Sequence, residues 1–182
     1  MSIASLNSAG GPLLALGYPG QIADDQECSI MSRINESTTG GTSTATPGMM
    51  DFGIAVGKGT NPGCCKFLAT SELPIGITVR NPVMSPDGLN NVGYAPTMAV
   101  GIMYLGDIFV QAYETVTDGD EVLALSDHGG RLGGITGGAA NGSTRLVVPG
   151  ANWVAELGQT TIAAGTIGRV RLTGTSNPRT SS

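Results

Sequence analysis

His128 is the only histidine in this chain of 182 residues. Histidine is the side chain that most often moves protons near neutral pH, so His128 is the first candidate for catalytic chemistry. It follows Asp127 in a glycine-rich stretch, where a Ser/His/Asp triad would lack the rigid partner that orients a catalytic imidazole. We therefore expect a solvated loop histidine. The sequence predicts that the protein is not an enzyme and has no catalytic residues.

Three acidic residues, Asp118, Asp120 and Glu121, lie close together in the sequence and suggest a possible cation site. A calcium-binding loop needs oxygen ligands at alternate positions, a central glycine and a distal glutamate. This segment supplies too few such ligands, whereas its Asp-Gly pair is typical of a hairpin turn that needs a positive φ. We expect a turn here and no metal. No other acidic pair forms a motif that would favour a hydrolase.

Neither the glycine-rich segments nor the cysteines have the spacing of a cofactor site. The stretch 129–138 lacks the Lys-Ser/Thr pair of a phosphate-binding loop and the helix that should follow it, and 57–60 fails for the same reason. Cys28, Cys64 and Cys65 lack the C-x-x-C spacing of a zinc site, and the adjacent pair cannot easily form a relaxed disulfide. We expect free thiols in a reducing compartment and no cofactor.

The composition excludes further classes of protein. Nine Lys+Arg stand against fourteen Asp+Glu, giving a formal net charge of −5 and a pI of about 4.6. Nucleic acid is therefore not an expected partner. Gly, Asp or Pro interrupts every apolar run before it reaches the length of a membrane span, so no membrane is expected. The first residues lack the basic region of a signal peptide, which favours synthesis in a cytoplasm.

Alternation of large and small residues predicts a mainly β fold. Ile75, Ile77 and Val79 have the period of two expected for a strand with one buried face, with Thr78 and Arg80 pointing outward. Strands are also predicted in 52–56, 98–104, 108–113, 153–157 and 169–173, and 121–125 is a short, nearly continuous apolar strand. Gly106-Asp107 interrupts one of them and predicts a bulge or turn. No segment has a convincing helical period. The pattern indicates a compact β-sandwich or barrel, either β-tulip-like or jelly-roll-like.

The chain divides into three parts by composition. Residues 1–48 have few periodic apolar stretches, and 37–48 is close to a low-complexity sequence of Ser, Thr and Gly. We therefore expect an extended N-terminal arm that is ordered mainly by contacts outside its own domain. Residues 49–174 form the β domain, and 175–182 form a polar, frayed tail. Arg169 and Arg171 point outward from the last strand. They form either a solvated face or an ion-pairing surface for an acidic partner.

Six short motifs occur in a characteristic order along the chain. Together they resemble the structural cement, or capsid decoration, proteins of tailed bacteriophages, over residues 17–173. The motifs are Tyr18-Pro19-Gly20-Gln21-Ile22-Ala23-Asp24, Ser32-Arg33-Ile34-Asn35-Glu36, Phe52-Gly53-Ile54-Ala55-Val56, Ile75-Gly76-Ile77-Thr78-Val79-Arg80, Val116-Thr117-Asp118-Gly119-Asp120-Glu121-Val122 and Val148-Pro149-Gly150-Ala151-Asn152-Trp153. The chain departs from the family pattern in 37–48 and in an insertion at 81–94.

The resemblance implies a protein that binds the outer surface of the major capsid protein lattice and stabilises the expanded shell. It would be made in the cytoplasm of the bacterial host and located on the capsid of the virion. Self-association is also implied, with a trimer favoured over a dimer. The alternative is another β-structural component of the virion, such as a tail or fibre domain.

Eight residues of the expected arm are the candidates for capsid or arm contacts: Tyr18, Pro19, Gly20, Gln21, Ile22, Asp24, Arg33 and Glu36. Arg33 stands out because the chain has few cations. Its planar guanidinium is suited to two parallel charge-assisted hydrogen bonds where the arm docks. A solvated Arg33 that contributes nothing measurable is the alternative.

Overall fold

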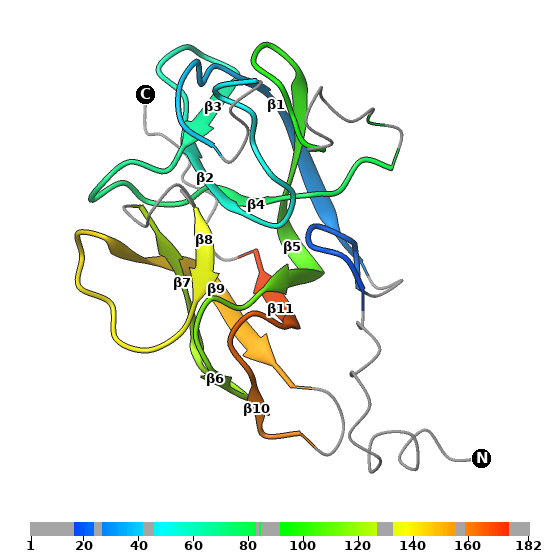
Figure 1. The fold of residues 1–182 in the computed structure, drawn as a ribbon, viewed down its shortest axis with the longest axis vertical. Coiled ribbons are helices and arrows are strands. Elements are labelled where there is room, and N and C mark those ends of the chain that lie inside the picture. The colour runs from blue at the N-terminus through cyan, green and yellow to red at the C-terminus, as the bar shows by residue number, and fades with distance from the viewer. Residues whose placement is uncertain are drawn as a thin grey trace.

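The computed structural model describes residues 17–23, 27–41, 46–82, 84, 92–126, 133–155 and 159–174. These ranges contain eleven strands and no helix (Figure 1). The strands are β1 (Ser29–Asn35), β2 (Ala55–Lys58), β3 (Cys64–Phe67), β4 (Gly76–Thr78), β5 (Ala99–Gln111), β6 (Val116–Thr117), β7 (Glu121–Leu125), β8 (Gly134–Thr136), β9 (Arg145–Val154), β10 (Thr161–Ile162) and β11 (Ile167–Thr173). Nothing in the described part of the chain has the helical length and apolar character needed to cross a membrane.

The first five strands form a closed barrel. Strand β5, which is 13 residues long, pairs in its first half with β1 on one side and with β4 on the other. β1 also runs parallel to β3, with Ile34 opposite Cys64, and β2 joins β3 to β4. The ring β1-β3-β2-β4-β5 is therefore complete, and its closure removes the free strand edges of an open sheet.

The second half of β5 belongs to another ring of strands. It pairs with β11, and the sheet continues through β9 and β7 to β8. A bridge between Ala112 and Ile135 then brings β8 back to the end of β5, where the Tyr113 N–H donates to the Ile135 carbonyl at 3.0 Å. β6 and β10 form a separate two-stranded sheet. The fold is thus two rings that share one strand, which confirms the predicted mainly β class.

Gly106 marks the point where β5 passes from one ring to the other. Its φ of +116° is accessible mainly to glycine. A Cβ atom at this position would lie 2.8 Å from the Cβ of Cys28. The predicted interruption at Gly106 is therefore a change of backbone conformation within a continuous strand.

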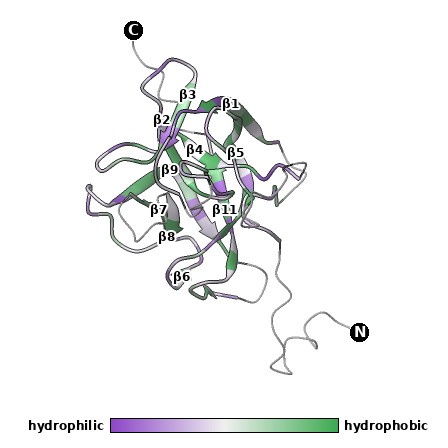
Figure 2. Ribbon diagram, turned by 45° about the horizontal axis from the view of Figure 1, so that its top comes forward, coloured by the Kyte–Doolittle hydropathy of each residue, from purple (hydrophilic) through white to green (hydrophobic). Residues whose placement is uncertain are grey.

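Two hydrophobic cores follow from the two rings. Val56, Phe67, Val100 and Ile102 belong to the core of the first barrel. The other core surrounds the fully buried Trp153. This second core extends onto the outside of the first barrel through Ala55, Ile77 and Met103. In Figure 2 the hydrophobic colour accordingly lies on the strands, for example on β7 and β8.

Because β4 lies between the two cores, both of its faces are buried. Thr78, predicted to point outward, is 0% exposed, and its hydroxyl donates to the Asp51 carbonyl at 2.8 Å. That prediction was wrong because a strand inside two packed layers does not need alternating polarity.

The described part of the expected arm lies within the β domain. β1 pairs with six residues of β5, and residues 20–23 continue along the same strand, with Ile22 opposite Ile108. The boundary at residue 48 therefore requires correction for 17–23 and 27–41. The strand was missed because its polarity is inverted: Ile30 and Ile34 are exposed, whereas the polar Asn35 is buried. Residues 1–16, 42–45 and the tail 175–182 lie outside the described ranges.

The two arginines of β11 have an intramolecular partner. Arg171 donates two hydrogen bonds to the Asp107 carboxylate, each at 3.0 Å. Arg169 Nε lies 3.7 Å from the same carboxylate, whose side chain is only 5% exposed. A buried carboxylate needs such pairing. These two arginines therefore hold β11 to β5 through Asp107. They do not form the predicted ion-pairing surface for an acidic partner.

Replacing Asn35 tests the contribution of β1 to the fold. Asn35 Nδ2 donates to the carbonyls of Gly48 and Tyr94, both at 2.9 Å, and its Oδ1 accepts from the Ser37 N–H at 2.9 Å. Asn35→Ala removes all three hydrogen bonds and should lower the free energy of unfolding by about 3 kcal/mol, although the Tyr94 carbonyl still accepts from the Met50 N–H at 2.9 Å. Denaturant unfolding followed by the fluorescence of Trp153, the sole tryptophan, measures this loss. Ser32→Ala, at an exposed position of the same strand, should cost less than about 0.5 kcal/mol; equal effects would contradict the prediction.

Candidate functional site

The segment Tyr18–Gln21 forms a tight turn. Its Pro-Gly pair, the Gly20 φ of +78° and the hydrogen bond from the Gln21 N–H to the Tyr18 carbonyl at 3.0 Å match a type II turn. The Gln21 side chain closes the turn from the other direction, because its Oε1 accepts from the Tyr18 N–H at 3.2 Å. The motif therefore has a local structural explanation.

This turn is held to β5 and to the segment after β4. The Gly20 N–H donates to the Phe109 carbonyl at 2.7 Å, and the Phe109 N–H donates to the Gln21 carbonyl at 2.9 Å. On the other side, the Arg80 N–H donates to the Gly20 carbonyl at 2.6 Å. The turn thus occupies the side of β5 opposite β11, beside β1, as the dark blue loop of Figure 1 shows.

Gly20 and Gly53 allow two backbone segments to touch. A Cβ on Gly20 would lie 2.8 Å from the Arg80 nitrogen and 2.9 Å from the Gly53 nitrogen, and one on Gly53 would lie 2.7 Å from the Gly20 nitrogen. Both glycines also have positive φ, +78° and +71°. Space and backbone conformation therefore each require glycine at both positions.

Arg80 lies close to two aromatic rings at this junction. The central carbon of its guanidinium is 4.8 Å from the centre of the Tyr18 ring and 5.4 Å from that of Phe52, within the range of a cation–π interaction. The Phe52 ring in turn packs edge-on against Tyr94. The Tyr18 side chain is 63% exposed, so the stack reaches the surface of the protein.

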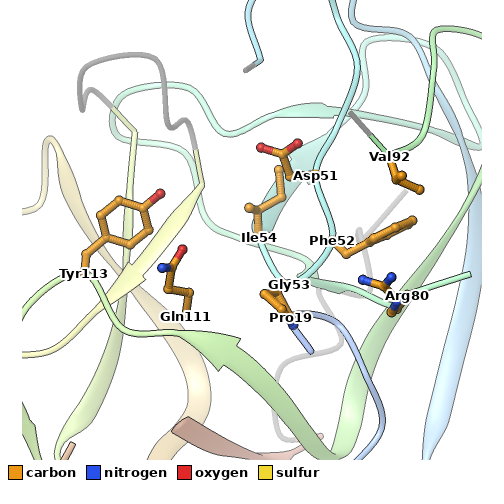
Figure 3. Close-up of a pocket in the computed structure, with 9 residues that line it drawn as sticks. All are labelled: Pro19, Asp51, Phe52, Gly53, Ile54, Arg80, Val92, Gln111 and Tyr113. Atoms are coloured by element: carbon orange, nitrogen blue, oxygen red, sulfur yellow. The ribbon is translucent and has the colours of Figure 1, made fainter. Parts of the chain in front are cut away.

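A cavity of about 240 Å³ opens beside this stack. Figure 3 shows Arg80 on one side of it and Gln111 and Tyr113 on the other, with Asp51 also in the wall. The remaining lining residues are Pro19, Phe52, Gly53, Ile54 and Val92. The cavity therefore combines an arginine, polar side chains and aromatic surface at the junction of the turn, β2 and β5.

Three of the sequence motifs meet at this one place: those containing Tyr18-Pro19-Gly20, Phe52-Gly53 and Arg80. The sequence pattern predicts Phe52 in a core face and Arg80 pointing outward, and neither residue was among the predicted site residues. Their presence in motifs was the available signal, but nothing in the spacing indicated that segments more than 25 residues apart touch. Gln111 and Tyr113 had no signal at all.

The other candidates lie elsewhere. Arg33 is opposite Val100 on β5, whereas Ile22 is opposite Ile108, and eight strand residues correspond to about 25 Å. Asp24 lies outside the described residues. The described members of this set therefore do not form one continuous site.

Glu36 closes the loop between β2 and β3. Its carboxylate accepts hydrogen bonds from the backbone N–H groups of Thr60 and Asn61 and from the Asn61 amide. The two backbone donors, Thr60 first, lower the pKa of Glu36 below its ordinary value of 4.5. Its visible role is to hold this loop in place.

The acidic turn of the sequence is a turn in the structure. Gly119 has a φ of +81°, Asp120 Oδ2 accepts from the Thr117 N–H at 2.7 Å, and Asp118 Oδ1 accepts from the Ala155 N–H at 2.8 Å. Among the described residues, no group of three His, Cys, Asp or Glu side chains is arranged to hold a metal ion. His128 lies outside the described ranges.

A pair of alanine substitutions separates crowding at the turn from the effect of φ. Gly63 has the same φ as Gly20, +78°, but a Cβ there would meet no atom within 4 Å. Gly63→Ala should therefore cost about 1 kcal/mol for the left-handed backbone alone. Gly20→Ala should cost about 3 kcal/mol, because overpacking adds to that term. Urea unfolding of both variants measures the difference, and equal costs would show that Gly20 is not crowded.

The cysteines should differ in reactivity. All three are free; Cys28 is exposed and Cys65 is fully buried. Burial is the main cause that raises the pKa of the Cys65 thiol from 9.0 to about 12. Because the thiolate is the reactive form, Cys65 should resist a thiol reagent at pH 8 while Cys28 reacts. Mass spectrometry after timed labelling tests this, and denaturant should make Cys65 reactive. Labelling of native Cys65 as fast as Cys28 would contradict it.

Comparison with known proteins agrees with these features. No curated protein matches the chain. Among solved structures, a chain from "The capsid of Myoviridae Phage XM1" has the same fold, with a TM-score of 0.61 and 15% identity, over 92% of this chain and 96% of that one. The family described as "Structural cement protein (E217 gp24/Pam3 gp6)" matches residues 8–173. The chain therefore belongs to the structural cement proteins of phage capsids.

Proposed function

We propose that this capsid cement protein binds the outer surface of the major capsid protein lattice and stabilises the expanded shell. The observation that carries the proposal is the family match over 8–173, which includes every strand described above. The fold of a phage capsid chain supports a place on the capsid rather than on a tail or fibre. A tail or fibre domain remains the alternative that an experiment must separate.

The two-ring fold suits such a role. A cement protein stabilises a lattice by adding buried contact area across subunit junctions, and stable interfaces bury about 1,200–2,000 Å² in total. A domain that holds its own shape loses little conformational entropy on binding. The first barrel is closed and the two rings share β5, so the protein can span a junction without reorganising its core.

The proposal includes two finer statements. The protein is not an enzyme, and the match to a family described as structural cement proteins supports this statement. Copies of the chain also associate with one another at the lattice, with a trimer expected and a dimer as the alternative. Analytical ultracentrifugation of the free protein, and the stoichiometry on shells, address this second statement.

Binding to shells is the direct test. Purified protein should add stoichiometrically and saturably to expanded shells prepared without it, and should raise their melting temperature by several degrees. Unexpanded shells and purified tails are the controls and should bind little. Failure to bind expanded shells would refute the proposal, and binding to tails instead would establish the alternative.

A further inference from the structure

Arg80 differs from most cations of the described residues in its electrostatic partners. Four of these cations pair with acids: Lys66 with Glu72, Arg145 with Glu114, and Arg169 and Arg171 with Asp107. No described carboxylate forms an ion pair with Arg80, although the chain carries a net charge of −5. Arg80 is nevertheless partly buried. Among the described residues, its guanidinium instead lies against the rings of Tyr18 and Phe52.

The two rings also determine what Arg80 can still bind. Each ring lies against the guanidinium group and takes the place of water there, whereas the N–H donors lie in the guanidinium plane. These donors match the two oxygens of a carboxylate. Arg80 lines the cavity of about 240 Å³, so a carboxylate entering from outside has space beside it.

The surroundings favour a carboxylate that belongs to a protein. The exposed Tyr18 ring adjoins the stack. Tyrosine and arginine are enriched among the residues that dominate protein–protein binding. Gln111 and Tyr113 line the opposite side of the cavity, which is open enough to admit a side chain from outside. The site thus fits one acidic side chain carried on a polypeptide segment.

We propose that Arg80 binds an acidic side chain of a capsid subunit, which enters the cavity beside Tyr18 and forms a two-fold charge-assisted hydrogen bond with the guanidinium. This inference rests on the proposed function and names the contact that the lattice makes. The competing explanation is that Arg80 only holds the Tyr18 turn against Phe52, with no role towards a partner.

The first test measures how tightly variants that lack the charge of Arg80 bind to expanded shells. Arg80→Gln should weaken binding to expanded shells by about 30-fold or more, as truncation of one partner of a desolvated pair does. Arg80→Lys should restore part of this loss, because it keeps the charge and loses the fork. Lys58→Gln is the matched control: it removes one exposed positive charge and should weaken binding by less than about 3-fold. Equal losses for Arg80→Gln and Lys58→Gln would overturn the inference.

Chemically modified shells separate a contact from a structural effect. Amidation of shell carboxylates with glycinamide removes the acids that Arg80 would bind. Wild-type binding should then fall to the level of Arg80→Gln, while Arg80→Gln itself should bind native and amidated shells equally. The wild-type protein could still bind amidated shells more tightly than Arg80→Gln does, by the same factor as on native shells. Arg80 would then only stabilise the fold of the protein, and the inference would be wrong. If the wild-type protein binds no expanded shells at all, the proposed function fails as well.

Discussion

Strand β5 is the constraint on which the rest of the fold depends. Its first half closes a barrel with β1 and β4, and its second half carries β11. A strand hydrogen-bonded on both sides cannot shift register without breaking both partners, so β5 fixes the two rings relative to each other. Gly106 makes this possible, because a residue with a side chain would be strained at its φ and would collide with Cys28.

The other side of the second half of β5 must also be covered, and the chain does this with residues 20–23. They lie between β1, which pairs along β5 as far as Leu105, and β8, which joins at Ala112. Unpaired strand edges promote aggregation. The N-terminal motif is therefore part of the fold before it is part of any interface. This explains why its glycine touches Gly53 and why its carbonyl accepts from Arg80.

Strands with one buried face could be predicted from the sequence, as in β11, where Val170 and Leu172 are 0% and 4% exposed. β1 could not, because its isoleucines face outward and Asn35 is buried in a network of hydrogen bonds with distant loops. The contact between the Tyr18, Phe52 and Arg80 segments could not be predicted either. Periodicity describes neighbours along the chain, whereas this site depends on how two rings bring distant segments together.

The junction between the Tyr18 turn and its neighbours therefore has a steric requirement and an electrostatic requirement, and different residues satisfy them. Gly20 and Gly53 satisfy the steric one, since no side chain fits between their backbones. Arg80 satisfies the electrostatic one, because its backbone N–H holds the turn while its guanidinium remains beside a cavity without a described acidic partner. Backbone and side chain of one residue thus act separately: the first contributes to stability in the free protein, and the second is free to contribute to binding. A change that alters only the side chain can then affect the lattice contact while leaving the turn closed.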